Sequence, residues 1–411
     1  MGNMGKPPGN HQLKYLSAAA FVVLFWFVYR LGLHHDTRDR LNHIAQGGAG
    51  GNPYGVEPSH YTGPVGSVDG AHPDVLSADA AEQYCANFRL QPFPREKAAR
   101  RKIYDLLLVN TELEMLDVRL GQMSAGVDYF VVLESDKTFT DKAKPLFVHE
   151  NWGRFAPYHD QIIRRTMDLT TGAFKDTWAR EGASRNAMYD QVVPFLTGEQ
   201  AASLDDVLLV SDVDEMFKPE TLKTLRNCEV PDRVTAMSRM FYYSFQWLQD
   251  GNWPHPQATL YKGEKDTILP DDLRKHSDKH LVLTDGGWHC SYCFSTLAEM
   301  VTKITSFSHT EMDRPEFKDP VKIIDRVRHG KDMYVPSPLP PPQKTRSQVD
   351  TDSVKRNRFD RSMCTRIERN FDVPDFLKAN PRQYDFMLNR DPPNAGFKDY
   401  EPAKGQLIES S

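Results

Sequence analysis

The sequence has little net charge, no internal repeat and no N-x-S/T glycosylation site. Lysine and arginine number 51 against 56 aspartate and glutamate, and the net charge of -5 gives no electrostatic case for a nucleic-acid partner. No motif recurs at a fixed period, so nothing indicates a repeat array. The missing sequon is compatible with a lumenal protein but does not support that location. The 411 residues are enough for one large domain with appendages.

Cysteine is also scarce, with five in the whole chain. Cys290 and Cys293 have C-x-x-C spacing, but a zinc site needs a second ligand pair at matching spacing, and the remaining three cysteines are scattered. A redox motif would lack a thioredoxin-like context. A disulfide in an oxidising compartment is therefore favoured. One thiol remains without a disulfide if the other four form two, and the sequence does not determine which cysteines pair.

One long apolar run stands near the start of the chain. Tyr15 to Tyr29 contains neither charge nor proline, and with Leu31 to Leu33 it approaches the roughly 20 residues that cross a bilayer. A secretory signal peptide is the alternative, but no small-residue cleavage site follows directly. Basic residues flank both ends, so they do not settle orientation. We expect a type II signal anchor over residues 15–33 behind a cytosolic tail of residues 1–14.

Composition divides the rest of the chain into three parts. Residues 34–100 are rich in Gly, Pro, Ser and Asn and predict a flexible stem. Residues 101–335 carry the apolar periodicity of a globular domain. Residues 336–411 begin with a proline-rich stretch and become charged, so we expect them to pack only partly on the domain.

Strand and helix patterns alternate within the globular region. Short apolar runs predict buried strands, and amphipathic stretches between them predict helices. The alternation indicates an α/β fold with a mostly parallel central sheet and helices on both faces. The predicted strands cover 103–110, 127–134, the region around 162–163, and 207–210, and the predicted helices begin at Leu113 and Trp178.

The most informative stretch is V-L-L-V-S-D-V-D-E, from Val207 to Glu215. Open α/β sheets bind ligands beyond the carboxyl ends of their strands, and here that end carries Asp212, Asp214 and Glu215. Carboxylates this close repel one another unless a cation lies among them. Magnesium and manganese take such oxygen ligands and bridge them to substrate phosphates. A solvated acidic turn is the simpler alternative.

Other candidate residues also have ordinary structural explanations. Arg185 could pair with a phosphate, although an arginine on an amphipathic helix is more often a surface charge. The aromatic stretch from Val234 to Trp247 is more often core, although one or two rings could stack on a sugar. His289 and His309 are each most simply structural, and a histidine late in the chain could complete a metal site begun by the aspartates.

Several of these stretches together resemble glycosyltransferase family 17. The similar pieces follow one another in the order of the family between Asp105 and Pro393, which makes the resemblance specific. They are D-L-L-L-V-N-T-E-L-E-M-L-D-V-R-L from Asp105, V-D-Y-F-V-V-L-E-S-D-K-T-F from Val127, Lys144-Pro145-Leu146, Asp205 to Glu215, Tyr242 to Trp247, G-W-H-C-S-Y-C-F from Gly287, and Phe371 to Pro393.

The resemblance implies a GT-A-like nucleotide-sugar-binding fold and an inverting transferase of the Golgi membrane. It would transfer GlcNAc from UDP-GlcNAc in β-1,4 linkage to a mannose of a glycoprotein N-glycan, with Mn²⁺ or Mg²⁺. By residue, the resemblance and the patterns above assign the donor to Asn110, Glu112, Arg119, Glu134, Arg185, Asp212 and His289; the metal to Asp212, Asp214 and His289; and the acceptor to Tyr242, Tyr243, Trp247 and Trp288.

A carboxylate must accept the proton of the attacking hydroxyl. Asp285, Glu299 and Asp272 follow the acidic motif in the chain, and Asp285 lies in the more motif-like context. Two other classes of protein stay open. One is a membrane-tethered carbohydrate-binding protein without catalysis, and the other is a glycoside hydrolase with paired carboxylates, which would need neither the D-x-D nor a metal.

Overall fold

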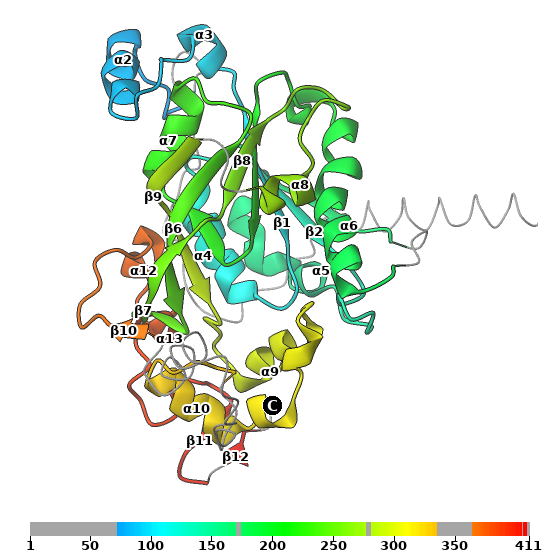
Figure 1. Ribbon diagram of the computed structural model, residues 1–411, viewed down its shortest axis with the longest axis vertical. Coiled ribbons are helices and arrows are strands. Elements are labelled where there is room, and N and C mark those ends of the chain that lie inside the picture. The colour runs from blue at the N-terminus through cyan, green and yellow to red at the C-terminus, as the bar shows by residue number, and fades with distance from the viewer. Residues whose placement is uncertain (1–71, 170–173, 277–280, 335–363, 405, 409–411) are drawn as a thin grey trace, which may run out of the picture. The chain divides into compact units, whose positions relative to one another are not determined.

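The computed structural model describes residues 72–169, 174–276, 281–334, 364–404 and 406–408 (Figure 1). The chain divides into two compact units, Met1–Glu57 and Pro58–Ser411, and all described residues belong to the second. The expected signal anchor at 15–33 and most of the expected stem therefore lie outside the described residues. Within the described ranges, no helix combines the length and the apolar character needed to cross a membrane.

A ten-stranded sheet forms the centre of the second unit, in the order β10-β7-β6-β8-β4-β1-β2-β3, with β9 beside β6 and β5 beside β9. The four strands predicted from sequence are confirmed and pair in parallel as β4-β1-β2-β3. They are β1 (Ile103–Leu108), β2 (Tyr129–Glu134), β3 (Ile162–Thr166) and β4 (Val207–Asp212). The others are β5 (Glu215–Phe217), β6 (Val234–Tyr242), β7 (Ser244–Trp253), β8 (Gln257–Leu260), β9 (Leu281–Ser291) and β10 (Cys364–Arg366).

The prediction of a mostly parallel sheet is wrong, although the α/β class is correct. Strand β8 runs antiparallel to β4, and the pairs β6–β7, β6–β8, β7–β10 and β5–β9 are antiparallel as well. The sequence conceals the hairpin between β6 and β7 because its turn lacks the usual glycine or asparagine. Tyr242 pairs with Ser244, so the chain reverses at Tyr243, which adopts a φ of 68°.

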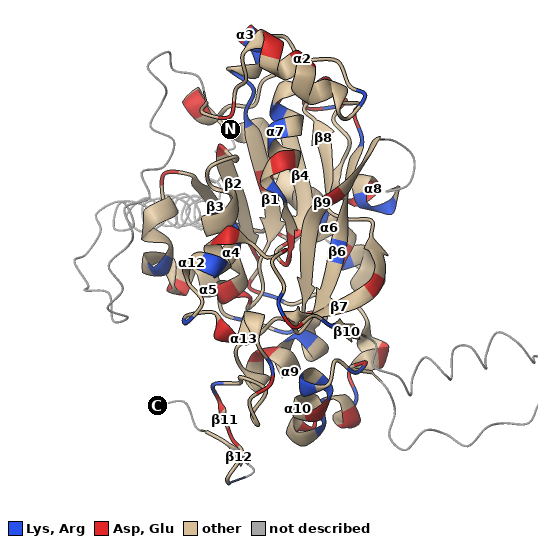
Figure 2. Cartoon of the chain, turned by 90° about the vertical axis from the view of Figure 1, so that its left-hand side faces the viewer, with Lys and Arg blue, Asp and Glu red and all other residues tan. Residues whose placement is uncertain are grey.

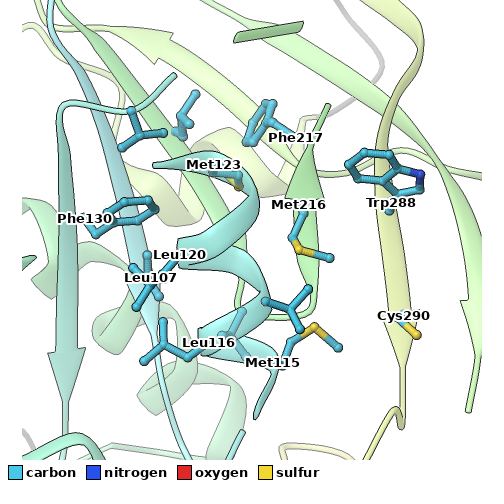
Figure 3. Packing of buried hydrophobic residues seen from close by; sticks show 14 of the residues in the cluster. Leu107, Met115, Leu116, Leu120, Met123, Phe130, Met216, Phe217, Trp288 and Cys290 are labelled. Carbon is cyan, nitrogen blue, oxygen red and sulfur yellow. The ribbon is translucent and has the colours of Figure 1, made fainter. Parts of the chain in front are cut away.

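Alternating strand residues bury both faces of the parallel part. Leu107 of β1 and Phe130 of β2 pack on α4 (Leu113–Met123), as Figure 3 shows. The neighbouring residue Leu106 points to the opposite face, towards α6 (Thr177–Asp190) and α8 (Pro270–Lys275). This period of two is the signature of a strand, and helices on both faces are confirmed.

Two further helices lie at one end of the sheet. At the carboxyl end of β9 a third apolar cluster is formed by α9 (Leu297–Ser306), α10 (Pro320–Arg328) and part of the C-terminal segment (Figure 1). The other elements are α2 (Ala78–Ala86), α3 (Arg95–Ala98), α5 (Phe147–Glu150), α7 (Pro219–Asn227), α12 (Asp375–Ala379), α13 (Asp385–Leu388), β11 (Tyr400–Glu401) and β12 (Gln406–Leu407), with short 3-10 turns between them.

Two disulfides tie segments together. Cys290 and Cys293 form the disulfide that was favoured for the C-x-x-C. Cys85 of α2 is joined to Cys228, the residue after α7, although it lies in the stretch assigned to the stem from composition. Cys364 is the cysteine outside both bonds. On the side that Figure 2 shows, lysine and arginine are interspersed with aspartate and glutamate.

Candidate functional site

The site lies where the order of the parallel strands reverses. From β1 the chain proceeds to β2 and β3 on one side, and then returns to place β4 on the other side of β1. Open α/β sheets bind ligands at such a switch point, in the crevice beyond the carboxyl ends of the two strands. Asp212 is the last residue of β4, and Asn110 follows β1 by two positions.

Asp212 is held by two guanidinium groups. Nη2 of Arg185, on α6, lies 3.1 Å from one carboxylate oxygen, and Nη2 of Arg274, on α8, lies 3.2 Å from the other. Burial alone would raise the pKa of Asp212, but Arg274 and then Arg185 outweigh it and hold that pKa well below its usual value. Each arginine also pairs with a glutamate, Arg185 with Glu181 and Arg274 with Glu215, so the two guanidinium groups are shared among three carboxylates.

Asp214 is the most enclosed carboxylate of the D-x-D. Lys303 of α9 donates to Oδ2 of Asp214 at 2.8 Å, and Nε2 of His289 on β9 lies 3.7 Å from Oδ1. These two groups, Lys303 first, overcome the effect of burial and hold the pKa of Asp214 well below its usual value, while the pKa of Lys303 is raised. Asp214 is therefore an anion, and a neighbouring ammonium already balances its charge.

Glu215 belongs to the framework of the site. Nη1 of Arg274 lies 2.6 Å from its carboxylate, the indole of Trp253 donates to it at 2.7 Å, and the backbone N–H of Asp212 donates at 3.0 Å. All of its neighbours are fixed parts of the fold, and its side chain is buried. Glu215 therefore orients Arg274 and the turn of the D-x-D.

Arg119, which was predicted to bind the donor, lies beneath the motif and is fully buried. Its guanidinium pairs with Asp105 at 2.6 Å and donates to the hydroxyl of Ser211. It also donates to the carbonyl oxygens of Asp212, Val213 and Glu215. One arginine thus satisfies three backbone acceptors of the acidic turn, and its contacts support the shape of that turn.

Three other donor candidates make local structural contacts. Oε2 of Glu112 accepts from the backbone N–H groups of Asn110 and Thr111, and the Asn110 side chain donates to Ser306 at 2.9 Å. Glu134 accepts from two backbone N–H groups of α5, at Val148 and His149. Burial nevertheless raises the pKa of Glu134. These acids cap turns and helices, while Asn110 keeps a buried Oδ1 without a partner at the end of β1.

The four aromatic residues assigned to the acceptor are all buried. Tyr242, Tyr243 and Trp247 belong to the apolar cluster around α9 and α10. Trp288 lies on β9 opposite Met216 of β5 (Figure 3), and its indole donates to Asp372 at 2.8 Å. The rings of Tyr242, Tyr243 and Trp247 lie in the core, which was the simpler interpretation of the aromatic stretch, whereas Trp288 also lines a cavity.

The three candidate bases occupy three different places. Asp285 is paired with Lys218 at 2.8 Å, next to a cavity of about 430 Å³ that Trp288 and Asp372 also line. Lys218 follows Glu215 by three residues, which along an extended strand is about 10 Å from the acidic motif. Asp272 is paired with Arg233.

Glu299 lies one helical turn before Lys303 on α9 and forms a capping box with Thr296. Burial, and then Glu114, raise its pKa to about 7.

The described residues do not assemble the predicted metal ligands into one cluster. No group of three or more His, Cys, Asp or Glu side chains within the described ranges is arranged to hold a metal ion. Asp212 pairs with Arg185 and Arg274, and Asp214 pairs with Lys303. Manganese or magnesium stays a prediction from the sequence.

Arg274 and Lys303 are the residues that sequence reasoning missed. Each is an ordinary cation on a short amphipathic helix, without a local motif. Their importance comes from the mixed sheet, because α8 follows the antiparallel strand β8 and α9 follows β9. No local pattern marks either residue, because the pairing of β8 with β4 and of β9 with β5 joins distant segments.

The fold and the site define an α/β protein with a cluster of paired carboxylates and cations at the switch point of its sheet. A family model, Glycosyltransferase family 17, matches residues 79–391. The chain belongs to glycosyltransferase family 17, a family of transferase enzymes, which confirms the resemblance seen in the sequence.

Curated relatives agree with this assignment. Human and rat β-1,4-mannosyl-glycoprotein 4-β-N-acetylglucosaminyltransferase are each 24% identical to the chain over 234 residues, and the mouse protein of that name is 23% identical. The match covers 49% of this chain and 42% of each relative. The chain thus matches less than half of the length of these relatives.

Proposed function

We propose that the protein transfers GlcNAc from UDP-GlcNAc to a mannose of a glycoprotein N-glycan. The observation that carries this proposal is the position of Asp212 and Asp214, with their three cationic partners, at the switch point of the sheet. Family membership supplies the reaction class. The donor sugar and the β-1,4 linkage come from the names of relatives at 24% identity, so they are part of the proposal.

The cations around the two aspartates suit a diphosphate leaving group. Arg185, Arg274 and Lys303 converge on the end of β4 from three different helices. A guanidinium group can bind two phosphate oxygens at once. Charged groups that are already in position stabilise a leaving group without having to move during the reaction. In the proposed reaction a sugar hydroxyl attacks the anomeric carbon while these groups accept the charge that develops on the diphosphate.

Glu299 is the carboxylate we propose as proton acceptor. Its pKa of about 7 is close to the pH at which a general base is most effective. It precedes Lys303 on α9 by four residues, so both side chains lie on the same face of that helix. Asp285 is less suited, because Lys218 neutralises it and β5 separates it from Asp214.

The disulfide between Cys85 and Cys228 supports an oxidising compartment for this reaction. Structural disulfides form and persist in the lumen of the secretory pathway and are rare in the cytosol. Two disulfides among five cysteines fit a lumenal domain. The Golgi lumen is the compartment we propose, in line with an acceptor carried on glycoproteins.

The direct test is to incubate residues 72–411 with a set of UDP-sugars and N-glycans that end in mannose, and to identify products by mass spectrometry. Asp212→Asn and Asp214→Asn are expected to abolish transfer, and Asp285→Asn is the matched acidic control. Circular dichroism verifies that each variant is folded. Binding of UDP without transfer to any acceptor would instead indicate a carbohydrate-binding protein without catalysis. Hydrolysis of glycans in the absence of nucleotide would overturn the proposal.

A further inference from the structure

One exposed indole lies on the helix that supplies Arg185. Trp178 stands near the start of α6 with 52% of its surface exposed, whereas the four aromatic residues expected to contact substrate are buried. Trp178, Glu181 and Arg185 are spaced three and four residues apart, so they form one stripe along the helix. At one end of this stripe Arg185 pairs with Asp212, and at the other end Trp178 is exposed to solvent.

The segment that follows α9 holds this stripe in place. Glu181 accepts a hydrogen bond from the hydroxyl of Ser308 and pairs with Arg185. The hydroxyl of Thr177 donates to the carbonyl oxygen of Ser308 at 3.0 Å. His309 packs perpendicular to the Trp178 indole, with ring centroids 4.7 Å apart. The indole is therefore fixed in position although half of it faces solvent.

The same segment lies across the ends of the first two strands. Asn110, just after β1, donates to the hydroxyl of Ser306 at 2.9 Å. Thr140, in the loop after β2, donates to the carbonyl oxygen of Thr305 at 3.3 Å. Residues 305–309 thus connect the carboxyl ends of β1 and β2 with Trp178. In an open α/β sheet this is the side on which a nucleotide lies.

We propose that Trp178 is the stacking platform for the nucleobase of the donor. Seven residues separate it from Arg185, which places the two about 10 Å apart along the helix. That separation is close to the span from the diphosphate to the base of a nucleoside diphosphate. A diphosphate at Arg185 and Arg274 therefore brings its base to the exposed indole. The inference rests on the proposed function, because it assumes a nucleotide donor.

The free energy of such stacking is large enough to measure. Replacing an aromatic platform by alanine costs about 1–3 kcal/mol per stacked base, which corresponds to roughly a 5- to 150-fold weaker affinity. Trp178→Ala is therefore expected to raise the dissociation constant for UDP by roughly 5- to 150-fold. Trp178→Phe keeps a flat ring and is expected to recover most of the affinity. Neither change is expected to alter the affinity for inorganic pyrophosphate, which has no base.

Isothermal titration calorimetry of the full chain with UDP and with pyrophosphate provides the measurement. Phe195→Ala is the matched control, because Phe195 is an aromatic residue that is 72% exposed and lies in the separate 3-10 turn Val193–Phe195, after the end of α6. Loss of UDP affinity in Trp178→Ala, with normal pyrophosphate binding, supports the platform. Equal losses for both ligands would show that the substitution disturbs Arg185, and would overturn it.

The platform and the proposed function fail in different ways. If the unsubstituted protein binds UDP and Trp178→Ala binds it equally well, the platform is wrong and the nucleotide donor stands. If Trp178→Ala instead raises only the KM for the glycan, the indole stacks on the acceptor, and the nucleobase assignment is overturned. If the unsubstituted protein binds no UDP at all, the donor itself is wrong, and both conclusions fall together.

Discussion

Lys303 and Asp214 form an ion pair with Nζ and Oδ2 2.8 Å apart, although 89 residues separate them in the sequence. The lysine comes from α9, beyond the antiparallel strands, and the aspartate comes from the turn after the parallel strand β4. The pair therefore joins the two halves of the sheet at the candidate site. The Asp214 side chain is 8% exposed, so its partner is important for folding as well as for charge.

Lys303→Met is expected to destabilise the protein by about 3 kcal/mol, because it leaves a buried carboxylate with only His289 beside it. Urea unfolding measures the change. The control is Lys378→Met, whose partner Asp375 is exposed, and there the expected change is about 0.5 kcal/mol. Similar losses in the two variants would contradict a special role for the Lys303–Asp214 pair.

Arg119→Lys is expected to reduce stability more than substrate affinity. The change keeps one positive charge opposite Asp105 but removes the forked contacts to Ser211 and to three carbonyl oxygens. A loss of about 3 kcal/mol is expected in urea unfolding, since buried acceptors lose their donors. The KM for the donor at low temperature, where the variant stays folded, should change little. A large rise in this KM with normal stability would indicate that Arg119 binds the donor.

Sequence reasoning was accurate where strands are buried on both sides. The apolar runs at 103–110, 127–134 and 207–210 have no polar alternation, and each became a parallel strand. It failed after Glu215, where pairing depends on contacts between distant segments. The aromatic run around Tyr243 indicates core equally well as a strand pair or as a helix, because burial and not periodicity determines it.

The site was predictable only in part for the same reason. The carboxylates belong to one short stretch and were found, with Arg185 and His289 as candidate neighbours. Arg274 and Lys303, which neutralise them, come from helices whose positions depend on the antiparallel strands. Composition and spacing identify charged residues but do not identify their partners, so the lysine and the two arginines that pair with these acids could not be found from the sequence.

Removing the disulfide between Cys85 and Cys228 is expected to destabilise the domain strongly. The bond closes a loop of 143 residues, and the loss of such a cross-link costs about 4–5 kcal/mol in the chain-entropy model. The double variant Cys85→Ser/Cys228→Ser, compared with Cys290→Ser/Cys293→Ser, separates this effect from thiol removal in general. The second pair are only three residues apart, so a smaller loss is expected. Urea midpoints that fall equally would contradict the argument from loop length.

Glu299 is expected to make stability depend on pH between about 4.5 and 7. Burial, and then Glu114, raise its pKa from 4.5 to about 7, so in this range the folded protein holds a proton that the unfolded chain has lost. Stability from this group is therefore complete below the unfolded pKa and is lost as pH rises through the folded one. The pKa difference corresponds to about 3 kcal/mol.

Glu299→Gln removes this titration and should flatten the profile of unfolding free energy against pH by about 3 kcal/mol across that range. Glu368→Gln, at an exposed position, should leave the profile unchanged. If Glu299 is also the proton acceptor, transfer by the unsubstituted protein rises with pH through about 7, in the direction opposite to its stability. A Glu299→Gln variant that transfers sugar at the normal rate, with only its stability profile altered, would confine Glu299 to a structural role.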